Sequence, residues 1–274
     1  MAQGTEEALS GAGPGEWILF TDADIRHPAS SLRELVGSAV MGRRAAVSLM
    51  ARLSTGSGWE RLLMPAFVYY FAQIYPFTWV NDVWRGTAAA AGGCMLVNAE
   101  ALRQAGGMAA IAPRTIDDVA LAKALKGTGA DIWLGLSGNG GDGAPRVESL
   151  RSYPGLADAW EMVARSAYTQ LGYNPLALAG TVVALSSIYL APPVLAAAGL
   201  ATRRPALAIA GLGAWTAMTA TYLPMVRYYR APLATAPALP FTALVYMAMT
   251  LSSARRHYAG GVAWKGRPAH PGGR

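Results

Sequence analysis

Two aspartates one residue apart, Asp22 and Asp24, directly follow the apolar run at residues 17–20. Such a short run, rich in aromatic and branched residues, is typical of a buried strand in a sheet covered on both faces. In an extended chain, residues i and i+2 point to the same side, so both carboxylates could reach one cation. Their oxygens suit Mg²⁺ or Mn²⁺, which proteins often hold with one or two carboxylates and substrate phosphates. The alternative is an acidic cap for the helix expected over residues 28–41.

A second acidic pair, Asp117 and Asp118, stands at the start of a helix expected from the apolar spacing of residues 119–125. The helix dipole stabilises negative charge at this end, so acidic first turns occur on many helices without a catalytic role. A carboxylate kept ionised at a helix start is also suited to act as a general base. Both interpretations are open from these residues alone.

Gly92 and Gly93 precede a strand expected near residues 94–97. Glycine permits close backbone approach or a positive φ, as a sugar or acceptor pocket would need, and a plain turn is the alternative. Cys94 fits a small buried apolar side chain. The glycine-rich segment 137–144 lacks the spacing of a phosphate-binding loop, so it predicts a simple loop.

The remaining pattern alternates strands and helices. Further strands are expected at residues 43–50 and 132–136, and an amphipathic helix at residues 160–173. The apolar, aromatic segment 59–80 is broken by Pro65 and Pro76. It predicts either an amphipathic segment at a bilayer interface or a pair of buried core helices.

The composition indicates that part of the chain lies in lipid. Hydrophobic residues make up 53% and charged residues 14%, and the mean hydropathy is +0.26, which is too apolar for an ordinary soluble enzyme. The net charge is +7, but no dense Lys/Arg block with interleaved aromatic residues points to nucleic acid. We therefore expect the positive charge to attract anionic lipid headgroups and a phosphorylated substrate. The single cysteine excludes an intrachain disulfide and a cysteine-based zinc cluster.

Three apolar segments, 176–200, 205–226 and 233–251, contain no charged side chain and approach the length needed to cross a membrane. We expect two or three crossings, with Pro192 and Pro193 able to kink the first segment or make it re-entrant. Three crossings would put the basic tail opposite the catalytic domain, whereas two would keep both on the cytoplasmic side. A transporter or channel is disfavoured, because these segments hold no buried charge.

The order of these features resembles the family 2 glycosyltransferases, which have the GT-A fold. The matching pieces are WILFTDADI (17–25), AGGCMLV (91–97), IDDVALAKAL (116–125) and VAWKGR (262–267). The chain is most similar to the hopene-associated glycosyltransferases, often called HpnB. That closer similarity adds residues 64–81, 162–176 and 189–193, and it covers essentially the whole chain.

The resemblance implies a role for each matching residue. Asp22 would lie near the ribose and diphosphate of the donor, and Asp24 would bind the divalent metal. Asp118 would be the general base, supported by Asp117, which replaces the more usual glutamate. Arg165 stands roughly where the family's Gln-x-x-Arg-Trp motif has a diphosphate-binding arginine, although the tryptophan is missing.

The resemblance therefore implies an inverting glycosyltransferase of hopanoid metabolism. It would be a multi-pass cell-membrane protein with a cytoplasmic catalytic domain, and it would use Mg²⁺ or Mn²⁺, a nucleotide-sugar donor and a lipid or polyprenol-like acceptor. We expect a mixed α/β domain of the GT-A type over residues 1–174, membrane helices over 175–253 and a basic tail over 254–274. Several strands precede the Asp-x-Asp strand in the family, so we expect this domain to be incomplete at its N-terminus. The alternative is a catalytically inactive membrane scaffold or partner subunit.

Overall fold

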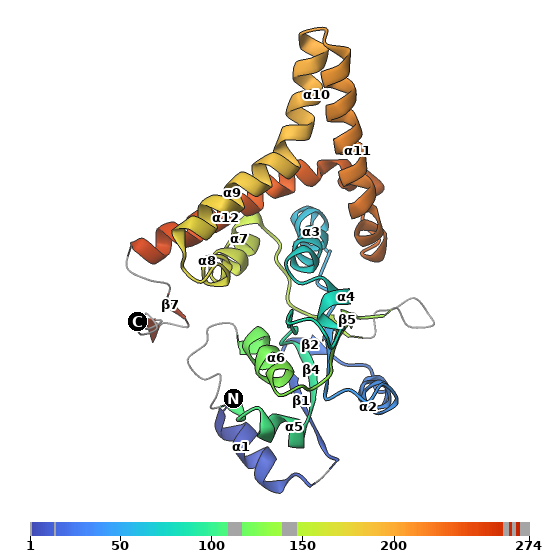
Figure 1. Cartoon of the computed structure of the whole chain (residues 1–274), viewed down its shortest axis with the longest axis vertical. Helices are drawn as coiled ribbons and strands as arrows, with labels where there is room; N and C mark the ends of the chain where they lie inside the picture. The colour runs from blue at the N-terminus through green and yellow to red at the C-terminus, as the bar shows by residue number, and fades with distance from the viewer. Residues whose placement is uncertain are drawn as a thin grey trace. The chain divides into compact units, whose positions relative to one another are not determined.

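The computed structural model describes residues 2–13, 15–108, 117–138, 147–259, 263–264 and 267–268 (Figure 1). The chain folds into two compact units. The first consists of Met1–Ser54 and Phe71–Ser152, and the second of Thr55–Tyr70 and Tyr153–Arg274.

The first unit is α/β. Its strands are β1 (Trp17–Thr21), β2 (Ile25–Arg26), β3 (Ala46–Met50), β4 (Cys94–Asn98), β5 (Ile132–Leu136) and β6 (Glu148–Ser149). Its helices are α1 (Ala2–Gly11), α2 (Ser31–Met41), α4 (Phe77–Val80), α5 (Ala99–Gln104) and α6 (Asp117–Gly127). The strands and helices expected from the apolar spacing are therefore present.

The central sheet has the order β1-β4-β3-β5 and is mixed. β4 runs antiparallel to both β1 and β3, and β3 runs parallel to β5. Thr21, the last residue of β1, pairs with Cys94, the first residue of β4. The ends of β1, β3 and β5 consequently lie at the same edge as the start of β4, and ligands of open α/β sheets bind outside such an edge.

Both faces of this sheet are covered. Met95 and Val97 of β4 pack on one side with residues of α5 and α6, and Cys94 and Leu96 pack on the other side with residues of α2. This alternation follows from the two-residue period of a strand. The expected mixed α/β fold is confirmed.

The expectation that the apolar run at residues 17–20 forms a buried strand is wrong in one respect. β1 is half-buried along most of its length, and its last residue is exposed. In the part of the chain that the structure describes, β1 pairs with β4 on one side and forms an edge of the four-stranded sheet. An edge strand keeps one flank open, which explains its partial exposure.

The argument that Asp22 and Asp24 point to the same side requires an extended chain after Thr21. The chain is not extended there. Residues 22–25 form a turn in which the Ile25 N–H donates to the Asp22 carbonyl at 3.2 Å. β2 then pairs with β6, and the Leu150 N–H donates to the Asp24 carbonyl at 2.7 Å. The Asp22 side chain is exposed and Asp24 is half-buried, so the turn gives the two carboxylates different surroundings.

The second unit is helical. It contains α3 (Gly58–Ile74, whose last four residues belong to the first unit), α7 (Leu156–Ala164), α8 (Ala167–Gln170), α9 (Pro175–Leu185), α10 (Ala191–Ala201), α11 (Pro205–Tyr228) and α12 (Leu239–Tyr258). A π-helix, η2 (Ser186–Leu190), joins α9 to α10, and a 3₁₀-helix, η3 (Leu233–Ala238), precedes α12. Two short strands, β7 (Ala263–Trp264) and β8 (Arg267–Pro268), pair with each other.

Two expected helices differ in detail. The single helix expected over residues 160–173 is divided into α7 and α8, because the chain turns at Arg165 and Ser166. The segment 59–80 forms α3 and α4, and much of α3 is buried, including Leu63, Met64 and Val68. The burial of α3 agrees with the alternative of buried core helices, and the position of this segment at a bilayer interface is not tested.

Among the described residues, three helical stretches are long and apolar enough to cross a membrane: Pro175–Ala201, Pro205–Tyr228 and Leu233–Tyr258. They overlap the three predicted segments. The first changes direction at η2, as Figure 1 shows between α9 and α10, so the predicted kink is confirmed. A π-helical turn and the prolines of the first turn of α10, Pro192 and Pro193, are usual causes of such a bend.

Candidate active site

Gly92 and Gly93 lie between the two acidic segments. The Gly92 N–H donates to Asp118 Oδ2 at 2.9 Å. A Cβ placed on Gly93 would stand 3.7 Å from Asp22 Oδ2 and 3.1 Å from Ile25 Cδ1. The structure therefore brings Asp22, the diglycine and Asp118 together from three distant parts of the sequence, at the edge where β1 ends and β4 begins.

The Asp118 side chain is held from two directions. It lies in the first turn of α6 and is half-buried. Its Oδ1 accepts a hydrogen bond of 2.7 Å from the Val119 N–H, and its Oδ2 accepts the bond from Gly92. The free N–H groups of a helix start favour a carboxylate at this position. The side chain is thus oriented by backbone donors of two separate segments.

α6 is also anchored at its other end. The Lys126 ammonium donates to the carbonyl oxygens of Val80 and Thr87, both at 2.8 Å. Partial burial lowers the pKa of Lys126, while Asp82 and Asp131 oppose that shift. Because Thr87 begins the segment that leads to the diglycine, Lys126 and Asp118 together fix α6 against that segment.

The two glycines allow close packing of neighbouring side chains and do not adopt an unusual backbone conformation. Neither Gly92 nor Gly93 has a positive φ. A Cβ on Gly92 would make ordinary contact with Asp118, at 3.4 Å from its Cβ, whereas a Cβ on Gly93 would crowd the Ile25 side chain. Of the two expected reasons for glycine, close packing is the one observed.

Ser48 stabilises the turn at Gly92 and Gly93 by hydrogen bonds, and the sequence patterns did not single it out. This buried side chain of β3 accepts a hydrogen bond of 2.8 Å from the Ala91 N–H and donates to the Cys94 carbonyl at 3.1 Å. Both ends of the turn are therefore hydrogen-bonded to β3 of the sheet. The available signal was a single hydroxyl in the otherwise apolar strand 45–50.

Thr21 and His27 also stabilise this turn by hydrogen bonds. The sequence patterns did not single out either residue. Thr21 Oγ1 donates to the Gly93 carbonyl at 3.0 Å and lies 2.8 Å from His27 Nε2. Since the hydroxyl hydrogen is used for Gly93, the imidazole supplies the hydrogen of the second bond, and its Nε2 carries the proton. His27 Nδ1 is then an acceptor, and it is buried without a hydrogen-bond partner among the described residues. Burial lowers the pKa of His27, which is consistent with the neutral ring.

The predicted metal ligands, Asp22 and Asp24, lie on the turn after β1. No group of three or more His, Cys, Asp or Glu side chains that could hold a metal occurs among the described residues. Two carboxylates nevertheless fit the way Mg²⁺ is commonly bound, because phosphate oxygens and water complete its octahedron. The binding of a divalent metal by Asp22 and Asp24 stays a prediction.

Two predicted site residues are not joined to this cluster by the structure. The Asp117 side chain lies outside the described part of the chain, as does most of the glycine loop at 137–144. Arg165 is half-buried at the C-terminus of α7 and belongs to the second unit. Their predicted roles stay predictions.

The family comparison decides the class of protein. The family model of glycosyl transferase family 21 matches residues 9–270. The chain belongs to glycosyl transferase family 21. The match covers β1, the diglycine turn, α6 and all three long apolar helices. No curated protein matches the chain. Membership of family 21 confirms the expected glycosyltransferase class, whereas the similarity to family 2 and to the hopene-associated enzymes stays a prediction.

Proposed function

We propose that this family 21 glycosyltransferase moves a sugar from a nucleotide-sugar donor to a lipid or polyprenol-like acceptor at the cell membrane. The observation that carries the proposal is the position of Asp22 and Asp118 on either side of Gly92 and Gly93. One carboxylate would face the donor diphosphate and the other the acceptor hydroxyl. The diglycine between them lets a sugar ring approach the backbone.

Asp118 is the general base in this proposal. It takes the proton of the acceptor hydroxyl as that oxygen attacks the anomeric carbon of the donor sugar. The bond between the anomeric carbon and the diphosphate oxygen breaks, and the nucleoside diphosphate leaves with the bonding electrons. One base without a carboxylate nucleophile favours a single displacement with inversion. General-base catalysis contributes about 10²–10⁴-fold, and Asp117 would support it.

Asp24, with Asp22, would hold Mg²⁺ or Mn²⁺ together with the donor phosphates. Such an ion would neutralise the negative charge on the leaving diphosphate. Asp22 would also contact the ribose, and Arg165 would add a second positive charge at the diphosphate. The hard oxygen ligands and the half-buried position of Asp24 support this assignment.

The acceptor is proposed to be a lipid because the same chain carries three long apolar helices. Its similarity to hopene-associated glycosyltransferases makes a hopanoid the first acceptor to test. The catalytic domain, proposed as residues 1–174, would lie on the cytoplasmic side. GT-A architecture belongs to the same proposal.

Sugar transfer by the purified protein in nanodiscs tests this function. A panel of nucleotide sugars is supplied with Mn²⁺ and with hopanoid or polyprenol acceptors, and glycolipid products are identified by mass spectrometry. We expect Asp118→Asn to lower transfer by about 10²-fold or more while donor binding is kept. Glu100→Gln, at an exposed carboxylate on α5, is the matched control and should transfer normally.

Wild-type rates in Asp118→Asn would refute the assignment of the base. Absence of both donor binding and transfer in the wild-type chain would instead support the alternative, a membrane protein of this family without catalytic activity.

A further inference from the structure

α12 is hydrogen-bonded along its whole length to α3, α7 and α8. Tyr246 Oη donates to the Leu63 carbonyl at 2.8 Å, and Ser253 Oγ accepts from the Tyr168 N–H at 3.0 Å. Three further contacts of the same kind join Thr242 to Tyr70, Ser252 to Trp160, and Arg256 to Glu161. These bonds occur near both ends of α12 and in its middle.

The helices that hold α12 carry charged side chains. Glu60 and Arg61 lie in α3, and Asp158 and Glu161 lie in α7. Glu161 remains 65% exposed although it pairs with Arg256. A charged side chain at the centre of a bilayer is costly, because the hydrocarbon offers it neither water nor a counter-charge. If α12 crossed the membrane, α3 and α7 would carry these charges into the hydrocarbon with it. The length and composition of α12 therefore overstate its ability to cross.

The opposite face of α12 is apolar and exposed. Phe241, Leu244 and Leu251 follow the three- and seven-residue spacing of one helix face, and each is at least 43% exposed. α9, which packs against α12, also exposes apolar side chains, among them Leu176 and Val183 at 81% and 64%. α12 thus has one face packed on α3, α7 and α8 and one exposed apolar face, which is the arrangement of a helix that lies along a membrane surface.

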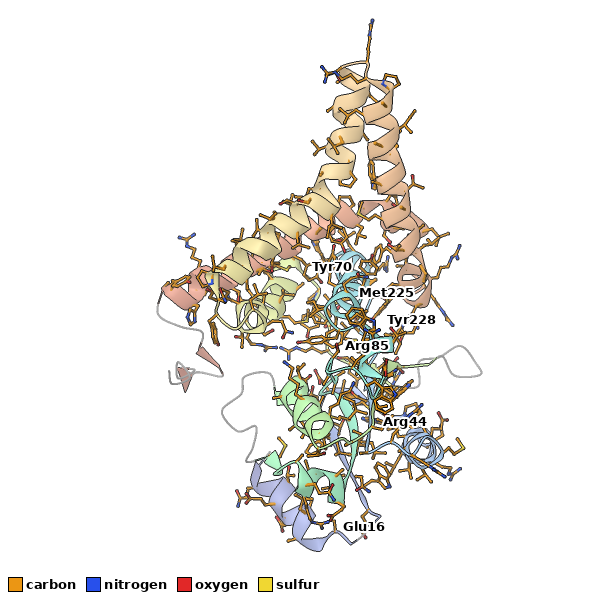
Figure 2. All side chains as sticks on the ribbon, in the orientation of Figure 1. Glu16, Arg44, Tyr70, Arg85, Met225 and Tyr228 are labelled. Atoms are coloured by element: carbon orange, nitrogen blue, oxygen red, sulfur yellow. The ribbon has the colours of Figure 1, made fainter. Side chains whose placement is uncertain are left out.

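The α10–α11 hairpin is built differently. A Cβ on Gly199 would stand 2.3 Å from Ala208 N, and a Cβ on Gly211 would stand 2.3 Å from Ala196 N. Close backbone contact through small residues is typical of helix pairs inside membranes. The outer surface of the hairpin is apolar, whereas its tip carries nitrogen-bearing side chains (Figure 2), contributed by Arg203 and Arg204.

An aromatic cluster marks the base of the hairpin. Tyr70 of α3, labelled in Figure 2, makes edge contacts with Tyr189 of η2 at 5.5 Å and with Tyr246 of α12 at 5.2 Å between ring centroids. Tyr69 contacts Tyr222 of α11 at 5.1 Å. Tyr69, Tyr189, Tyr222 and Tyr246 are all buried, so this cluster packs the base of the hairpin against α3 and α12.

The length of the hairpin fits one bilayer. Residues 186–201 rise by about 24 Å at 1.5 Å per residue. The hydrocarbon core is about 30 Å thick, and the arginine stems at the tip can extend over the remaining distance. The arginines would then lie among the headgroups of the far leaflet.

We infer that, among the described helices, α10 and α11 alone cross the bilayer, out and back, while α9 and α12 lie along its surface. The C-terminal end of α12 is then on the same side of the membrane as the proposed catalytic domain, residues 1–174. This inference rests on the membrane association in the proposed function, but it requires neither donor binding nor transfer.

Single-cysteine labelling tests the sidedness. Ser10→Cys in α1, Thr202→Cys at the hairpin tip and Ala259→Cys after α12 all replace exposed residues. The native Cys94 is completely buried, so it gives little background and reports misfolding if it reacts before denaturation. Sealed vesicles of both orientations are treated with a membrane-impermeant maleimide.

We expect Ser10→Cys and Ala259→Cys to be labelled from one side and Thr202→Cys from the other. Labelling of Ala259→Cys from the same side as Thr202→Cys would show three crossings and overturn the inference. Labelling of Thr202→Cys from the side of Ser10→Cys, or its protection from both sides, would also overturn it. Either result leaves the proposed transfer reaction standing, because sugar transfer is measured separately.

Discussion

The Gly92 N–H donates to Asp118 Oδ2 at 2.9 Å, and this bond links the proposed base to the turn that also borders Asp22. The Asp118 carboxylate is therefore held by a backbone N–H of the diglycine turn. Groups held in this way need little reorganisation when a substrate binds, and such preorganisation is a large source of catalytic power. The diglycine turn is accordingly the part of the site most sensitive to small changes.

Gly92→Ala and Gly93→Ala should have different effects. The new Cβ at residue 92 makes ordinary contact, whereas at residue 93 it would stand 3.1 Å from Ile25 Cδ1. Overpacking typically costs about 1–3 kcal/mol, so Gly93→Ala should lower the melting temperature. It should also raise the KM for the donor, because Ile25 adjoins Asp24. Equal melting temperatures and KM values for the two variants would contradict this view of the turn.

His27 is predicted to position the turn through Thr21. His27→Ala removes the donor to the Thr21 hydroxyl, a bond worth about 1 kcal/mol, and should raise the donor KM more than it lowers kcat. His27→Gln can supply an N–H at a similar reach and should recover much of the loss. Steady-state kinetics of both variants make the comparison. If His27→Gln is as impaired as His27→Ala, the buried Nδ1 atom is the important group instead.

Glu60 is predicted to stabilise the second unit rather than to act in catalysis. This side chain is 1% exposed, and its two oxygens accept hydrogen bonds from the N–H groups of Tyr153 and Ser57. The Glu60 N–H donates in return to Ser57 Oγ at 3.1 Å, which completes a capping box at the start of α3.

Glu60→Ala leaves buried donors unpaired and should lower the free energy of unfolding by about 2–3 kcal/mol. Glu60→Gln, which keeps the shape and an acceptor, should lose less. Thermal unfolding in detergent provides the measurement, with the exposed Glu100→Ala as control. Equal melting temperatures for Glu60→Ala and Glu100→Ala would exclude this role.

The elements that carry regular patterns were predictable. The apolar runs located β1, β3 and β5, and the carboxylates and glycines of the candidate site were found by type and spacing. Their assembly was not predictable, because it depends on the pairing of Thr21 with Cys94 between strands distant in the chain. Ser48, Thr21 and His27 carry no motif of their own, and their importance appears only once the turn is formed.

The apolar helices show a similar limit. Hydropathy predicted three segments of spanning length, and the described part of the chain contains three such helical stretches. The residues that bind α12 to α3 and α8, such as Tyr246 and Ser253, are residue types that a membrane-spanning helix can also contain. Their hydrogen bonds to α3 and α8 are properties of the folded chain. Length and composition therefore predict affinity for lipid, but not which helices cross it.

Isothermal titration of the purified protein with UDP and other nucleoside diphosphates, with and without Mn²⁺, tests the central claim most directly. We predict metal-dependent binding of at least one of them to the wild-type chain and to Glu100→Gln, and loss of that binding in Asp24→Ala. Binding that needs no metal, or that persists unchanged in Asp24→Ala, would contradict the assignment of the turn after β1 as the donor site.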